Sequence, residues 1–99
     1  MDTQCFYVYI LCCENGSYYT GYTTDLKRRY REHARGTRKS KFTRSFKPLA
    51  IAQFWTIDSD KRLAMRVEKH IKKLTRKDKE RLILRPELLL AEFPAIKHK

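Results

Sequence analysis

Lysine and arginine side chains are concentrated in two segments of this sequence. Between positions 27 and 47, ten of the 21 residues are Lys or Arg, and Glu32 is the one acid. Aromatic residues are interspersed among these cations, at Tyr30, Phe42 and Phe46. Cations bind phosphate oxygens and aromatic rings can stack on bases, so the segment predicts nucleic-acid binding, chiefly through phosphates. The residues expected to make these contacts are Lys27, Arg28, Arg35, Arg38, Lys39, Lys41, Arg44 and Lys47.

Arginine and histidine recur at a helical spacing inside this first basic segment. Arg29 and His33 are four residues apart, which places both side chains on one face of a helix. Arg29 offers a planar fork that matches a phosphate group, and His33 could relay a proton or bind a phosphate oxygen. A solvated helix arginine and a surface histidine are the plainer alternatives.

The second basic segment surrounds one acid of interest. Eleven of the 25 residues from position 61 to position 85 are basic, against three acids. One of the acids, Glu68, lies four residues before Lys72, so a simple i, i+4 salt bridge would explain it.

Tyrosines are concentrated near the N-terminus. Their hydroxyls need hydrogen-bond partners wherever the rings are buried, although ordinary sheet aromatics would also explain them. Five of the six tyrosines fall in this region, namely Tyr7, Tyr9, Tyr18, Tyr19 and Tyr22.

Length and charge limit what the chain can be. With 99 residues, a formal net charge of +12 and 41% apolar residues, it fits one folded domain with a polyanionic partner. The longest apolar run, residues 5–13, has nine residues, well short of the ~20 that span a bilayer. Asp2 stands where a signal peptide would carry a cation. We therefore expect a cytoplasmic protein that does not enter a membrane.

The three cysteines, Cys5, Cys12 and Cys13, all lie on this apolar run. An odd number with two adjacent members does not form a secreted disulfide framework, and no CxxC pair accompanies a histidine couple. We expect free thiols that act as small hydrophobic groups.

The N-terminal segment, residues 5–22, is predicted to form a β-hairpin. Residues 5–13 are rich in aromatic and β-branched types, which is typical of a strand buried on both faces. Asn15-Gly16 is a strong hairpin signal, because both central residues of such a turn must accept positive φ. Residues 18–22 form the returning strand.

A short helix and a third strand should follow. Thr or Asp at positions 23–25 can cap a helix over residues 26–35, with Leu26, Tyr30 and Ala34 as its apolar stripe and Gly36 as its stop. A polar loop over residues 37–47 leads to a strand over residues 49–57, which is too apolar to be half exposed and which places Trp55 in the core.

The C-terminal part is predicted to be helical. The acids of residues 58–60 cap a longer helix with a stripe of Leu63, Val67, Ile71 and Leu74. Residues 75–78 have capping-box spacing, and Pro86 interrupts the helical stretch that they start. We expect one domain over residues 1–85 and a C-terminal extension over residues 86–99 that is partly helical or frayed.

Several of these segments together resemble the GIY-YIG nucleases, specifically the small stand-alone bacterial branch. Residues 7–9 (Tyr-Val-Tyr) and 19–21 (Tyr-Thr-Gly) resemble the paired motifs that name the family. The continuation over residues 19–33 resembles the family's helix, which carries a functional arginine and, one turn on, a histidine or tyrosine. Residues 64–72 are similar to the segment that holds its single metal-binding glutamate, and Phe42-Thr43-Arg44 with Pro48 is similar to the stand-alone members.

Three positions depart from the family pattern. Tyr7 replaces the glycine of the first motif, and Thr20 replaces the isoleucine of the second. Tyr22 stands where characterised nucleases often carry a lysine or arginine that helps to activate the base, which bears on the rate of any catalysis.

Both the order of elements and the resemblance indicate an α+β fold: a small, mainly antiparallel three-stranded sheet with helices packed on it, in the order β-β-α-β-α-α. The resemblance implies a divalent-metal-dependent endonuclease that hydrolyses DNA phosphodiesters. It implies a base role for one motif tyrosine, for which we favour Tyr9, while Tyr19 orients water or phosphate. Arg29 would bind the scissile phosphate, and His33 would relay a proton or bind a phosphate oxygen. Glu68 would hold one Mg²⁺ or Mn²⁺, which binds weakly in the absence of nucleic acid.

Alternatives remain open at the level of sequence. The chain could be a nucleic-acid-binding module on a nuclease scaffold with little or no turnover, and RNA could replace DNA. A protein partner could supply specificity, and a purely structural docking role is a third hypothesis.

Overall fold

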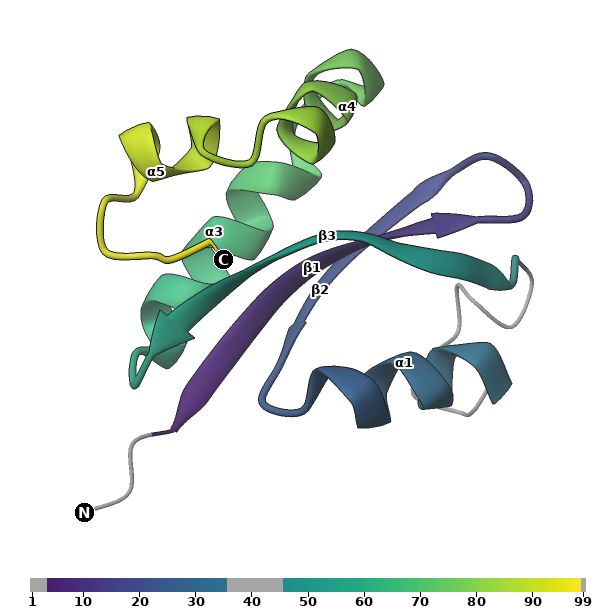
Figure 1. The fold of residues 1–99 in the computed structure, drawn as a ribbon, viewed down its shortest axis with the longest axis horizontal. Helices are drawn as coiled ribbons and strands as arrows, with labels where there is room; N and C mark the ends of the chain where they lie inside the picture. Colours follow the sequence, from purple (N-terminus) through teal and green to yellow (C-terminus); the bar gives the residue numbers. More distant parts are fainter. Residues whose placement is uncertain (1–3, 36–45, 99) are drawn as a thin grey trace.

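The computed structural model describes residues 4–35 and 46–98. Three strands form one antiparallel sheet in the order β2-β1-β3. Helix α1 lies on one face of the sheet, and α3, α4 and α5 lie on the other (Figure 1). This is the α+β architecture that the sequence predicts. The elements are β1 (Cys5–Cys13), β2 (Tyr18–Thr23), α1 (Leu26–Arg35), β3 (Pro48–Asp58), α3 (Lys61–Lys72), α4 (Arg76–Leu84) and α5 (Leu88–Glu92).

The β1–β2 hairpin forms where expected, but its turn differs from the prediction. Gly16 has a φ of +83°, whereas Asn15 is not in the positive-φ region. The Asn15 side chain instead accepts hydrogen bonds from the amide and the hydroxyl of Ser17, at 3.1 and 2.6 Å. An Asn side chain that bonds two residues ahead can stabilise a turn without a left-handed backbone of its own.

The central strand β1 divides the interior into two clusters. Because successive side chains of a strand point to opposite faces, Val8 and Ile10 face α3 while Tyr9, Leu11 and Cys13 face α1. Side chains 8 to 11 are all essentially inaccessible, which confirms a strand buried on both faces.

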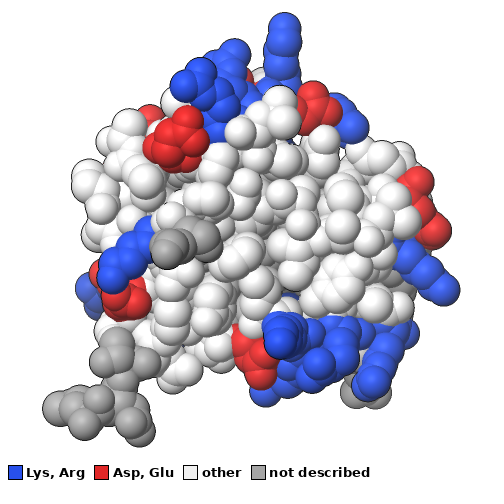
Figure 2. Space-filling view, viewed as in Figure 1, with Lys and Arg blue, Asp and Glu red and all other residues white. Residues whose placement is uncertain are grey.

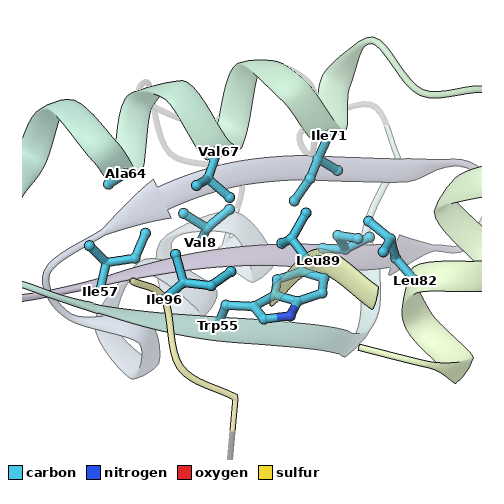
Figure 3. Close-up of a cluster of buried hydrophobic side chains, with 10 residues drawn as sticks. Val8, Trp55, Ile57, Ala64, Val67, Ile71, Leu82, Leu89 and Ile96 are labelled. Carbon is cyan, nitrogen blue, oxygen red and sulfur yellow. The ribbon is translucent and has the colours of Figure 1, made fainter. Parts of the chain in front are cut away.

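The larger cluster, which we call the main core, lies between the sheet and α3, α4 and α5 (Figure 3). Trp55 is fully buried there, as predicted, and its indole N–H donates to the Pro86 carbonyl at 3.0 Å. The helices that cover it begin at side-chain caps: Asp60 accepts from the Leu63 amide at 2.9 Å and Thr75 from the Asp78 amide at 3.2 Å. The buried members of the main core are Val8, Ile10, Trp55, Ile57, Ala64, Val67, Ile71, Leu82, Leu89 and Ile96.

The smaller cluster, which we call the α1 cluster, joins α1 to the sheet. Leu26 and Tyr30 pack against Tyr9, Leu11 and Cys13, as the predicted stripe requires. The third member of that stripe was wrong: Ala34 is exposed, and the neighbouring His33 is buried. Strand β3 also differs from expectation at its start, where Leu49 is 64% exposed.

The C-terminal segment is partly helical, and its end packs on the sheet. Ile96 is buried in the main core, so a frayed tail is wrong for this part of the chain. The backbone of Lys97 exchanges two hydrogen bonds with Thr56 of β3, at 2.7 and 2.8 Å. Within residues 4–35 and 46–98, no helix has the length and apolar character to cross a membrane.

Candidate active site

Tyr9 and His33 form a buried hydrogen-bonded pair between β1 and α1. The Tyr9 hydroxyl lies 2.9 Å from His33 Nε2. Both side chains are almost completely inaccessible, at 1% and 0% exposure. Because an unpaired polar group would be costly at this depth, each residue satisfies the other. The pair also fixes the position of α1 on the sheet.

Gly21 makes room for the Tyr9 phenol. Gly21 pairs with Tyr9 across β1 and β2. A Cβ atom at position 21 would lie 2.5 Å from the Tyr9 hydroxyl oxygen, 2.8 Å from Cζ and 3.3 Å from a ring carbon of Tyr19. Such distances are far inside van der Waals contact, so only glycine permits the tyrosine to lie across β2. This is a steric reason for a glycine at the end of the second motif.

Tyr19 completes a group of three rings. Its ring centroid lies 4.8 Å from that of His33, with the planes at 62°, and 6.4 Å from that of Tyr9. Unlike Tyr9, Tyr19 is half-buried. The structure therefore brings together one enclosed phenol and one that solvent can reach.

Burial and the charge of Arg29 together shift the pKa values of Tyr9 and His33. Burial, followed by the charges of Tyr19 and Glu68, raises the pKa of Tyr9, while hydrogen bonding and charge from Arg29 lower it by less. Burial and then the positive charge of Arg29 lower the pKa of His33 to about 4. His33 is thus neutral near pH 7, and a neutral imidazole can accept a proton.

The Arg29 guanidinium is held by an acid that the sequence prediction missed. Glu32 accepts from it at 2.9 Å, and the Arg29 side chain is 18% exposed. The i, i+3 spacing of these residues was visible in the sequence, but it did not reveal which of the neighbouring cations Glu32 contacts.

Glu68 projects from α3 on the opposite face of the sheet from α1. Its side chain is 20% exposed and lies 3.6 Å from Lys72 Nζ, so the expected salt bridge is present. Its charge also raises the pKa of Tyr9, by less than burial and the charge of Tyr19 do. Within the described ranges, no group of three or more His, Cys, Asp or Glu side chains could enclose a metal ion. A lone carboxylate suits a hard cation such as Mg²⁺ or Mn²⁺ whose other ligands are water and phosphate oxygens.

A hollow of about 520 Å³ adjoins Glu68 on the outer surface of α3. Besides Glu68 and its salt-bridge partner Lys72, the lining residues are Met65 and three cations to which the sequence prediction gave no role, namely Arg62, Arg66 and Lys69.

The predicted nucleic-acid-binding residues fall into two sets. Lys27, Arg28 and Arg35 are exposed on α1, and Lys47 is exposed before β3. Lys and Arg side chains gather over α1 along the lower edge of the molecule in Figure 2. The remaining predicted contacts lie outside the described residues, namely Arg38, Lys39, Lys41 and Arg44.

Comparison with known proteins yields consistent matches. The model of the GIY-YIG catalytic domain matches residues 5–81. The UPF0213 protein BH0048 of Halalkalibacterium halodurans is 48% identical over 77 residues, covering 78% of this chain and 80% of the relative. The UPF0213 protein VNG_2274C of Halobacterium salinarum is 46% identical over 76 residues, covering 77% and 96%. Neither name states an activity.

A solved structure also matches. The solution NMR structure of the UPF0213 protein BH0048 from Bacillus halodurans is 46% identical in sequence and has a TM-score of 0.51. The match covers 80% of this chain and 82% of the other. Fold and sequence therefore lead to the same group of small proteins.

Proposed function

The chain belongs to the GIY-YIG catalytic-domain family, which implies an endonuclease-like function, and on this premise we propose a divalent-metal-dependent endonuclease that hydrolyses DNA phosphodiester bonds. The observation that carries the proposal is the cluster of Tyr9, His33 and Arg29, with the Glu68 charge acting on it. Phosphodiester hydrolysis needs a base for water, a cation for the phosphate and support for the leaving oxygen. These residues can supply each of these functions.

Tyr9 and His33 would act together as the base. Because the pKa of Tyr9 is raised, a free phenolate is disfavoured near pH 7. A relay avoids it: Tyr9 would accept the proton of the attacking water while its own hydroxyl proton passes to His33 Nε2, 2.9 Å away. Burial and then the Arg29 charge hold the His33 pKa low; a phosphate bound to Arg29 would offset the second of these causes and would thereby favour this transfer.

Arg29 and Tyr19 would position the reacting groups. The planar guanidinium can bind two phosphate oxygens at once, which a lysine cannot do. Tyr19, fixed against the His33 ring, would orient the attacking water or the phosphate. Glu68 would hold one Mg²⁺ or Mn²⁺, which supplies charge neutralisation at the phosphate and at the leaving oxygen.

Cleavage of labelled DNA in Mg²⁺ or Mn²⁺ tests the proposal. The substrates should include single-stranded, fully paired, flapped and branched DNA. We expect Glu68→Ala to abolish cleavage while binding remains largely intact. Glu92→Ala, which removes an exposed acid from α5, serves as the matched control and should cleave like the wild type. Absence of cleavage on every substrate would refute the proposal.

A nucleic-acid-binding module with little turnover is the second candidate. Tyr22, which replaces the frequent cation of the family, packs against the main core on the opposite face of the sheet from Tyr9. It therefore adds no positive charge beside the base. DNA binding that persists in EDTA, together with absent cleavage, would select this function.

A further inference from the structure

A hollow on the α1 face of the sheet takes no part in the chemistry proposed above. It measures about 340 Å³, roughly ten times the ~30 Å³ that one water molecule occupies in the liquid, and can accommodate a nucleobase. We call it the Tyr7 pocket. It is lined by Tyr7 and Phe54 from the sheet and by Thr24, Asp25, Leu26 and Lys27 at the start of α1.

The Tyr7 ring lies outside both the main core and the α1 cluster. Tyr9, Tyr18, Tyr19 and Tyr22 each belong to, or pack against, the main core or the α1 cluster, whereas Tyr7 packs against neither. It is partly exposed, and its ring meets Phe54 edge to face, with centroids 6.2 Å apart and planes at 61°. Partly exposed aromatic rings that line a hollow are a platform on which a base can stack.

The Tyr7 pocket and the candidate active site lie on the same face of the sheet, the face that α1 covers. Tyr7 and Tyr9 are two residues apart on β1, so they share a face and their Cα atoms are about 6.8 Å apart. Phe54 pairs with Tyr9 across the sheet. This separation of the two tyrosines is on the scale of one nucleotide step, so a strand bound across this face can place a base in the pocket next to a phosphate at the candidate site.

The charges at the pocket favour a base inside it and a phosphate at its rim. The Asp25 carboxylate repels phosphate, but it can accept hydrogen bonds from the amino groups of a base. One of its oxygens accepts from the Arg28 amide at 3.0 Å, which leaves the other for a ligand. Lys27 is exposed at the rim and can bind the phosphate of the same nucleotide.

We propose that the Tyr7 pocket binds the base of an unpaired nucleotide next to the scissile phosphate. A base inside a duplex would have to leave its stack to enter, which costs free energy that an unpaired base does not require. The preferred substrates are therefore gapped, flapped or single-stranded DNA rather than continuous duplex. This inference rests on the proposed function for the position of the scissile phosphate.

DNA binding measured by fluorescence anisotropy in EDTA tests the pocket without relying on cleavage. The probes are a duplex with a single-stranded gap and the same duplex fully paired. We expect Tyr7→Leu to weaken binding of the gapped probe roughly tenfold and to change binding of the paired probe less than twofold. Tyr7→Phe keeps the ring and should bind both probes like the wild type. Lys27→Ala should weaken binding of the gapped probe more than Lys77→Ala, which removes an exposed charge from α4.

An abasic scan of the gap strand locates the base. In the wild-type protein, removal of one base should weaken binding at a single position, and that loss should disappear in Tyr7→Leu, since the two changes remove the same contact. Equal affinity at every abasic position in the wild type would overturn the inference even if Tyr7→Leu failed to fold. The inference would also be overturned if the position at which base loss matters only in the presence of Tyr7 lay more than two nucleotides from a mapped cleavage site. If the abasic scan finds such a position but the protein cleaves no substrate, the result supports base binding in the Tyr7 pocket and refutes the nuclease proposal.

Discussion

Gly21 and Tyr9 share the tightest contact of the candidate site. Because a Cβ at position 21 would lie 2.5 Å from the Tyr9 hydroxyl oxygen, Gly21→Ala must displace the phenol from His33. We expect a loss of about 1–3 kcal/mol in the free energy of unfolding, together with loss of cleavage. Urea denaturation and the DNA cleavage assay measure the two effects.

Gly16 provides the matched control for this substitution. Its φ is +83°, and a Cβ there meets nothing within 4 Å. Gly16→Ala should therefore cost about 1 kcal/mol through backbone strain and leave cleavage unchanged. Adding Tyr9→Phe to Gly21→Ala removes the closest contact and should recover part of the lost stability; no recovery would argue against the steric explanation.

His33 predicts a pH-dependent stability. Its pKa is about 4 in the folded chain, below the usual 6.5, so the unfolded state binds more protons between these values. The contribution of neutral His33 to the free energy of unfolding is about 3 kcal/mol. It is fully present above pH 6.5 and is lost as the pH falls toward 4. Urea denaturation across this range, compared with His33→Gln, isolates it. The difference between the two proteins should shrink as the pH falls; a constant difference would contradict a buried neutral imidazole.

The sequence predicted which residues come together in this site better than it predicted how deeply they are buried. The four-residue spacing of Arg29 and His33 placed them on one helix face, and the structure brings both to Tyr9. The sequence nevertheless left a surface histidine open as the plainer alternative for His33, because a histidine satisfied by a tyrosine 24 residues away leaves no local signal. The base role of Tyr9 and the metal role of Glu68 stay predictions until the variants are measured.

The secondary-structure elements with a strong local signal were the predictable ones. The β1–β2 hairpin carries Asn-Gly, and α3 carries a sustained apolar stripe after a capping aspartate. Residues 94–98 carry no periodicity, since one buried side chain, Ile96, and one backbone bridge are enough to fix them. Their packing depends on tertiary contacts that a local pattern does not contain.

Ile96 should therefore contribute strongly to stability. Ile96→Ala removes a side chain that is 3% exposed in the main core and should cost about 2–4 kcal/mol in the free energy of unfolding. Leu84→Ala removes an aliphatic side chain that is 81% exposed and should change stability by less than about 0.5 kcal/mol. Equal effects in urea denaturation would contradict the docking of the tail.

For the whole molecule, the net charge of +12 predicts binding that weakens steeply with salt. Neutralising Lys27 and Arg28 on α1 together should reduce the slope of log K against log salt by about 2, since each phosphate contact contributes about one unit. Neutralising Lys77 and Lys79 on α4, on the opposite face, should change the slope less. Equal changes would indicate that the DNA does not distinguish the two faces.

The separation of the interior into two clusters has a consequence for amide hydrogen exchange. The main core joins the sheet to α3, α4 and α5, whereas α1 is held by the smaller α1 cluster and the Tyr9–His33 pair. Helix α1 can therefore open without unfolding the rest, and its amides should exchange at a lower free energy than those of β1 or α3. Such an opening would withdraw Arg29 and His33 from Tyr9 while the fold persists. The candidate site would then assemble and disassemble as a local unit, and Tyr9→Phe should accelerate exchange in α1 alone.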